Sequence, residues 1–265
     1  MKGALADASP FAFLSLRFLL AGALLWLVFA RRGVAREAIV PGAVLGAFLF
    51  GGYAFQTWGL LYTSPSKSAF ITGSSVVWVP ALLLLRGAKL RKASFAGGLL
   101  GLAGIYLLVM PSGIASVNRG DVLTLAGAVS FALHIMLVGD YTRRHSFAHL
   151  VPVQIAVAGL LATVAWPIEP LHRLHWTSGL AGAILITAVL ATALAFTVQN
   201  WAQQFTAPSH TAIIFALEPV FAALTAWVVM DERLGGKAFA GAALVLAGMI
   251  VSELWASAAA SPVEG

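Results

Sequence analysis

A long internal duplication constrains the fold of this chain more than any other feature. Gln56-Thr57-Trp58 and Thr63-Ser64-Pro65-Ser66 in the first half are echoed by Gln199-Asn200-Trp201 and Thr206-Ala207-Pro208-Ser209 in the second. Each copy continues through an apolar stretch to Phe-Ala-Gly, and the offset between the copies grows from 143 to 144 residues after one insertion. Self-similarity over this distance predicts two halves with the same order of helices.

The composition places these halves in a lipid bilayer. Hydrophobic residues make up 60% of the chain and charged residues 10%, whereas soluble domains contain about 25% charged residues. A soluble domain could not bury that much apolar surface. Duplication in so apolar a chain is typical of membrane transporters built from two repeats. The absence of cysteine excludes disulfides and thiolate metal sites.

Apolar runs long enough to cross a membrane occur nine times. A spanning helix needs about 20 mostly apolar residues, and the runs are too long and lack the alternation expected of strands. Charged or turn-forming residues separate them. The predicted spans are 10–30, 40–62, 66–85, 94–111, 121–139, 148–167, 177–200, 209–230 and 236–256.

Basic residues are distributed unequally between the two sets of loops. With the loop after the first span in the cytoplasm, nine basic residues fall on the cytoplasmic side and five on the external side. This bias predicts an external N-terminus and a cytoplasmic C-terminus. The net charge of +6 is then explained by loops that contact anionic lipid headgroups, and not by nucleic acid. We expect the protein in the inner (plasma) membrane.

Several motifs in a fixed order identify a family resemblance. They are Ser9-Pro10 with Leu16-Arg17-Phe18, the Gln56–Ser66 stretch, Gly120-Asp121, and Glu218-Pro219 with Asp231-Glu232. In this order the chain resembles the drug/metabolite transporter superfamily, and specifically its EamA-domain permeases. The resemblance implies an all-α integral membrane bundle of two inverted five-helix repeats.

The first repeat has one predicted span fewer than the second. The resemblance therefore implies a further helix before residue 1, and we expect Met1 to be an internal or misassigned start. The predicted organisation is a shortened first repeat over 1–112, a linker over 113–119, a second repeat over 120–257 and a cytoplasmic tail over 258–265.

Polar residues within two duplicated spans predict a central cavity. Thr211, Glu218 and Thr225 recur every seven residues and so share one helix face. Span 66–85 carries Ser68, Thr72 and Ser75 on one face, with Ser74 and Trp78 nearby, and the offset aligns Ser75 with Glu218. The alternative is hydrogen bonding between helices.

Candidate substrate contacts follow from this pattern and from the duplication. Gln56 and Gln199 would either face substrate or cap neighbouring helix ends. Glu218 would bind a cationic group, couple transport to protons, or form a structural pair. The predicted substrate-binding residues are Gln56, Thr72, Ser75, Trp78, His134, Gln199, Thr211 and Glu218.

Three other residue types have structural interpretations that we favour. Arg17 would snorkel to the external interface or stabilise packing, although it could offer charge to an anion. His134 is expected to be a packed, hydrogen-bonded group in preference to a proton relay. His145 and His149 have metal-chelating spacing but no third ligand, so no metal site is predicted. Gly42 and Gly46 form a small-residue face that permits close helix packing.

These observations favour secondary transport of small metabolites such as amino acids. The substrate site would open to each side of the membrane in turn, by alternating access. Export is the expected direction. No phosphate-binding loop or hydrolase motif occurs, so neither ATP hydrolysis nor enzymatic activity is predicted, and no cofactor is expected. The alternative is a membrane regulatory or assembly subunit that transports nothing. Proton coupling and a homodimer are left open by the sequence.

Overall fold

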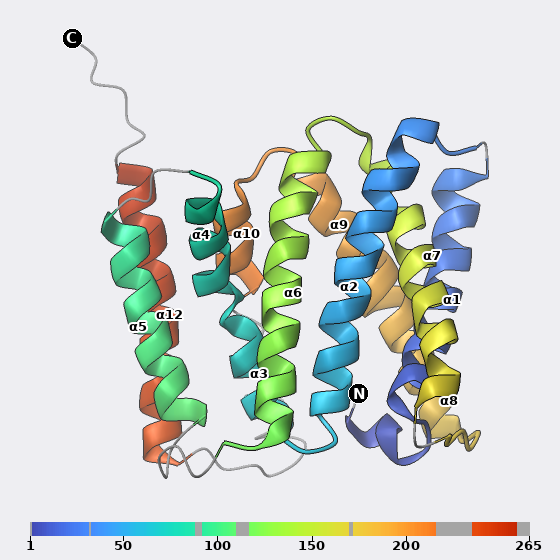
Figure 1. Cartoon of the computed structure of the whole chain (residues 1–265), viewed down its shortest axis with the longest axis horizontal. Coiled ribbons are helices and arrows are strands. Elements are labelled where there is room, and N and C mark those ends of the chain that lie inside the picture. Colours follow the sequence, from blue (N-terminus) through green and yellow to red (C-terminus); the bar gives the residue numbers. More distant parts are fainter. Residues whose placement is uncertain are drawn as a thin grey trace.

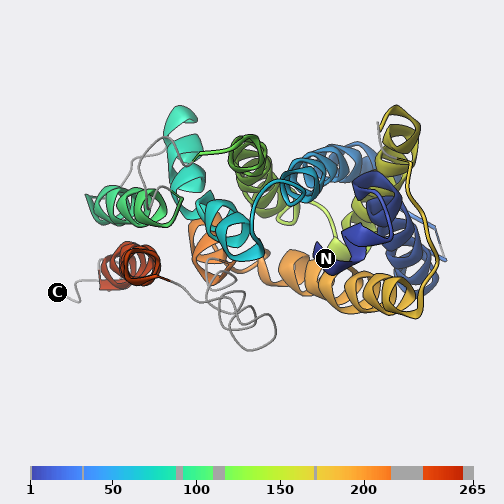
Figure 2. The same cartoon turned by 90° about the horizontal axis from the view of Figure 1, so that it is seen from below.

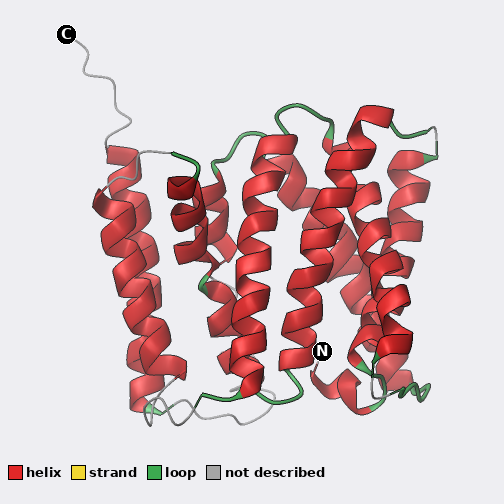
Figure 3. Ribbon diagram, in the orientation of Figure 1, coloured by secondary structure: helices red, strands yellow, loops and turns green. Residues whose placement is uncertain are grey.

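The computed structural model describes residues 2–31, 33–87, 92–109, 117–169, 172–215 and 235–258. Within these ranges the chain is helical, and strand-like pairing is limited to one isolated bridge between Ala8 and Leu174 (Figure 3). The α-helices are α1 (Pro10–Leu25), α2 (Ile39–Gly59), α3 (Pro65–Gly73), α4 (Ser75–Leu85), α5 (Lys92–Val109), α6 (Arg119–Tyr141), α7 (Phe147–Ala165), α8 (Ser178–Ala188), α9 (Ala195–Ala202), α10 (Pro208–Phe215) and α12 (Gly236–Ala258). The all-α prediction is confirmed.

Shorter helical pieces extend or join these helices. Three are 3-10 turns: η1 (Lys2–Ala6), η3 (Arg36–Ala38) and η5 (Trp166–Ile168). Two are π-helical: η2 (Trp26–Ala30) continues α1, and η6 (Val189–Leu194) joins α8 to α9. A π-helical turn holds one more residue than an α-helical turn, and such turns occur often at functional sites.

Six helical segments of the described chain are long and apolar enough to cross a membrane. They are Pro10–Ala30, Arg36–Gly59, Lys67–Leu85, Arg119–Tyr141, Phe147–Ile168 and Ser178–Ala202. These segments coincide with six of the nine predicted spans. Spans 94–111 and 236–256 largely coincide with α5 and α12. The total of nine spans and the inverted relation of the two halves stay predictions.

Some expectations fall outside the part of the chain that the structure describes. Glu218 and Thr225 are among these residues, as is the Asp231-Glu232 pair. Most of the predicted linker and nearly all of the predicted tail also lie outside the described ranges.

Neighbouring helices in the bundle are often distant in sequence. α5 and α12 lie side by side at one end of the molecule, and α1, α7 and α8 lie at the opposite end (Figures 1 and 2). Between them, α2 packs against both α6 and α7, while α3 and α4 pack against α6. The central position of α6 brings segments from both halves of the duplication around it.

Close contact between these helices depends on glycine. A Cβ atom on Gly46 would lie 2.6 Å from the carbonyl oxygen of Gln154 in α7, and one on Gly59 would lie 2.8 Å from the carbonyl oxygen of Gly120 in α6. Gly42 likewise faces α7. The predicted small-residue face of α2 is therefore confirmed, and larger side chains would push the helices apart.

Helix starts in the middle of the bundle are fixed by side-chain caps. The Ser64 hydroxyl accepts a hydrogen bond from the backbone N–H of Lys67 at 3.2 Å, next to a proline at the first position of α3. Asn118 and Asp121 form a capping box at the start of α6, with bonds of 3.1 and 2.9 Å. These caps satisfy backbone N–H groups that have no partner within the helix.

Candidate substrate cavity

A cavity of about 520 Å³ lies at the centre of the bundle. Its described walls come from α1, α2, α3, α4, α6, α10 and the continuous segment α8–η6–α9. Both copies of the duplication therefore contribute to one space. Gly3, Leu60 and Pro65 also line it, so the cavity extends toward the end of the bundle where α2 ends and α3 begins.

Five of the eight predicted substrate contacts line this cavity. They are Gln56, Thr72, Ser75, His134 and Gln199. Among the described lining residues, Thr211 and Trp78 are absent. Glu218 lies outside the described residues.

Local packing explains why Trp78 and Thr211 do not reach the cavity. Trp78 packs against the core cluster of Val79 and Ala132, and its indole N–H donates to the Ser74 hydroxyl at 3.2 Å. The Thr211 hydroxyl bonds within its own helix turn, donating to the carbonyl oxygen of Ala207 at 3.4 Å. Trp78 was expected to form part of the cavity wall, but its side chain packs into this core cluster instead.

The two duplicated glutamines are both held in place by a neighbouring side chain. Gln56 Nε2 donates to the Thr72 hydroxyl at 2.9 Å, and that hydroxyl donates to the carbonyl oxygen of Ser68. Gln199 Nε2 donates to Gln203 Oε1 at 2.9 Å, and Gln203 in turn donates to the carbonyl oxygen of Ile135. Both amides are buried and oriented, and their carbonyl oxygens are chemically suited to accept hydrogen bonds from a solute.

His134 begins a buried chain of hydrogen bonds. His134 Nε2 lies 2.8 Å from Gln154 Oε1, Gln154 Nε2 donates to Asn200 Oδ1 at 3.1 Å, and Asn200 donates to the carbonyl oxygen of Phe196 at 2.9 Å. With the Gln154 carbonyl as acceptor, His134 carries its proton on Nε2. The prediction of a packed, hydrogen-bonded histidine is confirmed. The chain also links α6, α7 and α9 behind the cavity wall.

Arg17 lies in the cavity wall, which agrees with the expected packing role and not with snorkelling to the external interface. The side chain is 1% exposed. Its Nε donates to the Thr192 hydroxyl at 2.7 Å, and its Nη2 donates to the Tyr53 hydroxyl at 3.3 Å and to the Ala191 carbonyl oxygen at 3.0 Å. The guanidinium carbon also lies 4.5 Å from the centre of the Tyr53 ring. Contact with an anion was the less favoured expectation for Arg17, and Tyr53 was not among the predicted substrate contacts.

The π-helical segment explains the position of Arg17. Carbonyl groups in such a turn depart from the α-helical hydrogen-bonding pattern, and the Ala191 carbonyl oxygen in this turn accepts a hydrogen bond from Arg17. Thr192 is turned in the same direction, with its hydroxyl donating to the carbonyl oxygen of Thr187 at 2.8 Å. An aromatic neighbour and a local set of acceptors thus keep the charge inside the bundle.

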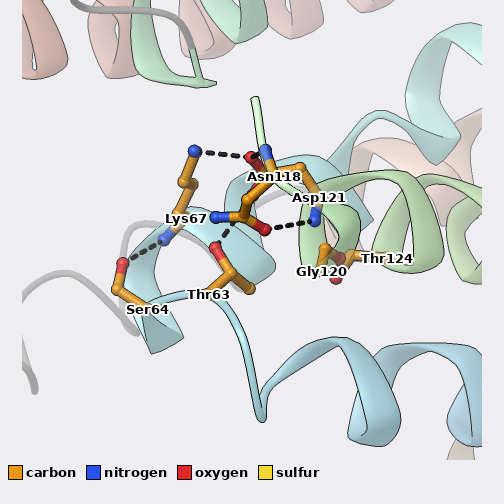
Figure 4. A network of polar contacts seen from close by, with 7 residues as sticks. All are labelled: Thr63, Ser64, Lys67, Asn118, Gly120, Asp121 and Thr124. Atoms are coloured by element: carbon orange, nitrogen blue, oxygen red, sulfur yellow. Dashed lines mark hydrogen bonds and ion pairs between the residues drawn. The ribbon is translucent and has the colours of Figure 1, made fainter. Parts of the chain in front are cut away.

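A polar network ties α3 to α6 at one end of the cavity (Figure 4). Lys67 Nζ pairs with Asp121 Oδ2 at 2.6 Å, and the Thr63 hydroxyl donates to Asp121 Oδ1 at 2.9 Å. Asp121 is 3% exposed. At the opposite end of α6, Asp140 pairs with Arg86 at 2.5 Å, but both side chains are nearly half exposed. Exposed pairs contribute little to stability, so the two ends of α6 are held with different strength.

The fold and the cavity define a class of protein: a multi-pass helical membrane protein with a cavity lined by both polar and apolar side chains. The model of the EamA-like transporter family matches residues 1–110 and 118–254. The chain therefore belongs to the EamA-like transporter family. Membership implies a lipid bilayer and a small-molecule substrate as its partners.

Named relatives agree with this assignment. An uncharacterized transporter of Archaeoglobus fulgidus is 33% identical over 255 residues, covering 96% of this chain and 80% of the relative. The uncharacterized transporter YyaM of Bacillus subtilis is 26% identical over 263 residues, covering 92% and 84%. A solved crystal structure has a TM-score of 0.75 and 20% sequence identity to this chain. The match covers 98% of this chain and 92% of the chain in that structure, which shows a shared fold.

Proposed function

We propose that this protein is a secondary transporter that exports small metabolites, such as amino acids, through the plasma membrane by alternating access. The observation that carries the proposal is that Gln56 and Gln199, equivalent residues of the two copies, both line one cavity. A substrate bound between repeats is the arrangement that repeat-built transporters use. Gln56, Thr72, Ser75, His134 and Gln199 are the proposed substrate contacts.

The size and lining of the cavity support a small amphipathic substrate. Its volume of about 520 Å³ lies within the range of roughly 300–1,000 Å³ found for small-molecule sites. Amide, hydroxyl and imidazole groups share the walls with the rings of Phe131 and Phe196. Such walls suit a solute that has both polar and apolar parts.

The unequal ends of the cavity support alternating access. The part-buried Lys67–Asp121 pair and its cap hold one end, whereas the exposed Arg86–Asp140 pair holds the other. In the orientation that the basic loops favour, the Lys67–Asp121 pair faces outward and the C-terminus lies in the cytoplasm. The interruption between α3 and α4 at Ser74 supplies a position where the helix can bend.

Glu218 remains a proposed substrate or proton site on the strength of its sequence position alone. A carboxylate within a span is costly unless it is paired or used. If it couples transport to protons, flux through the wild-type protein will depend on the pH difference across the membrane. Flux through Glu218→Gln would lose that dependence, and a wild-type rate that ignores pH would contradict proton coupling.

Metabolite release from expressing cells tests the proposal. Cells with the wild-type protein, with Gln199→Leu and with an empty vector are compared by mass spectrometry of the medium at equal membrane abundance. Gln204→Leu is the matched control, since Gln204 is an exposed amide five residues further along whose side chain bonds only the carbonyl of Trp201 among the described residues.

We expect selective release of one or a few metabolites from wild-type and Gln204→Leu cells, and its loss in Gln199→Leu cells. Release identical to that of the empty vector would overturn export. A Gln199→Leu protein that fails to accumulate in the membrane, with no metabolite released by the wild type, would instead favour a structural subunit.

A further inference from the structure

The amide of Gln56 has a fixed direction, because a short series of hydrogen bonds, here called a relay, connects it to a backbone carbonyl. The Thr72 hydroxyl donates its one proton to the carbonyl oxygen of Ser68 at 2.9 Å. That hydroxyl can then only accept a further bond, so Gln56 offers it an N–H group, at 2.9 Å. The relay leaves the Gln56 carbonyl oxygen on the other side of the amide.

The second copy fixes Gln199 in the same way through a different side chain. Gln203 Nε2 donates to the carbonyl oxygen of Ile135 at 2.9 Å, so the side-chain oxygen of Gln203 faces Gln199. Gln199 therefore donates its Nε2 to that oxygen, at 2.9 Å. Because both glutamines line the cavity, a solute there can donate to the carbonyl oxygen of each.

A third relay gives His134 the same character. Asn200 donates to the backbone carbonyl oxygen of Phe196 at 2.9 Å, and its side-chain oxygen accepts from Gln154 at 3.1 Å. The Gln154 oxygen then accepts from His134 Nε2 at 2.8 Å, which leaves Nδ1 of this cavity-lining ring without a proton and able to accept. Three polar groups of the wall thus each give a donor to the protein interior and retain an acceptor.

From these three relays we propose that the cavity selects solutes whose polar head carries N–H donors. The carbonyl oxygens of Gln56 and Gln199 and the Nδ1 atom of His134 accept from that head. The rings of Phe131 and Phe196, which line the same cavity, contact the apolar body of the solute. Recognition depends on the direction of hydrogen bonds and does not depend on any charge in the wall.

Thr72 and Gln203 act as positioning residues, because each sets the direction of one glutamine amide. A glutamine released from its relay could turn its amide and present N–H groups in place of its oxygen, which would weaken the preference for a donor. This proposal deepens the proposed function and rests on it for the meaning of the cavity.

Two uncharged probes of nearly equal shape test the preference. 3-Phenylpropanamide and 4-phenylbutan-2-one share a ring and a carbonyl group, and they differ only in having an amino or a methyl group beside that carbonyl. Their binding to the purified protein in lipid nanodiscs is measured by calorimetry at pH 7.5. An N–H group that finds no acceptor costs free energy on leaving water, so a cavity without this recognition would bind the ketone more tightly. We expect the amide to bind at least about tenfold tighter than the ketone.

Variants of the positioning residues assign the preference to the oriented amides. Thr72→Val and Gln203→Met should each lower the amide-to-ketone affinity ratio about threefold, with little change in affinity for the ketone. Thr142→Val is the control for Thr72, since Thr142 is also buried and its hydroxyl also donates to a carbonyl four residues earlier. Gln204→Met is the control for Gln203, since Gln204 is the next residue and is not among the described lining residues. Both controls should keep the wild-type ratio, and where Gln203→Met does not fold, Thr72→Val decides.

A third probe identifies the kind of N–H head. 3-Phenylpropan-1-amine carries the same ring and is an ammonium ion at pH 7.5. Binding tighter than that of the ketone, with a preference that Thr72→Val lowers, would show that the cavity accepts ammonium heads. Binding weaker than that of the ketone, with the preference for the amide intact, would restrict the cavity to uncharged N–H heads.

The outcomes separate this inference from the proposed function. An amide that binds no tighter than the ketone, binding of none of the probes, or a ratio that Thr72→Val and Gln203→Met leave unchanged overturns selection by N–H donors, even if the protein exports other metabolites. A wild-type preference without flux of any probe into proteoliposomes supports recognition of the head while contradicting transport.

Discussion

The two copies of the duplication contribute some matching and some differing groups to the cavity. Tyr53 and Gln56 of α2 correspond to Phe196 and Gln199 of α9 at the same offset, and all four line the cavity. The copies differ by the hydroxyl of Tyr53, which accepts a hydrogen bond from Arg17. At the offset of 143 residues the counterpart of Arg17 is Leu160, which is 58% exposed. Among the described lining residues, the two copies thus share amides and aromatic rings, and Arg17 belongs to the first copy.

Arg17→Leu removes the difference between positions 17 and 160 and should have the largest effect on transport. It gives the first copy the apolar residue of the second, and we expect uptake of the transported metabolite into proteoliposomes to fall about 20-fold, because leaving the hydroxyls of Thr192 and Tyr53 without their donor costs roughly 1–3 kcal/mol. Leu160→Ala is the control at the equivalent position and should leave uptake nearly unchanged. Equal losses in both variants would show that the copies are not distinguished at this position.

The two glutamines test the similarity of the copies. We expect Gln56→Leu and Gln199→Leu each to raise the apparent KM for the exported metabolite about 3- to 10-fold, since each loses one neutral hydrogen bond of about 0.5–1.5 kcal/mol. Gln204→Leu serves again as the control. A large effect at one position and none at the other, in proteins of equal abundance, would mean that substrate contacts one copy alone.

The starts of α1 and α7 differ in a smaller way. Ser146 caps α7 with its own hydroxyl, accepting from Ala148 at 3.3 Å. At α1 the acceptor is a distant carboxylate: Glu169 in the loop after α7 accepts from the N–H of Phe11 at 3.3 Å. Burial raises the pKa of Glu169 despite this hydrogen bond and the nearby His172.

The smallest expected effect is a pH dependence of stability through Glu169. A pKa raised by folding means that the native state binds the proton more tightly, so this contribution is full below the unfolded pKa of 4.5 and is lost as the pH rises through the folded value. The melting temperature of Glu169→Gln should therefore change less between pH 4.5 and 7.5 than that of the wild type. Ser146→Ala should lower the melting temperature similarly at both pH values.

How much of this site the sequence could predict depended on the range of the interactions involved. The duplication alone indicated Gln56 and Gln199, because they are polar residues at equivalent positions of its two copies. It could not indicate Arg17, whose position depends on a π-helical turn 174 residues away at Ala191 that no residue pattern reveals. Gln154 and Asn200 were missed for the same reason, since their bonds to each other and to His134 join three separate helices.

The turn η6 has a further consequence for the residues that follow it. One extra residue in a turn rotates the rest of a helix by about 100° relative to an uninterrupted α-helix. Phe196 and Gln199 lie directly beyond η6, so their direction is set by the number of residues in the turn as well as by their own identity. Deleting one residue between 189 and 194 would change the phase of α9, turning both side chains out of the cavity while leaving every cavity-lining residue present in the sequence.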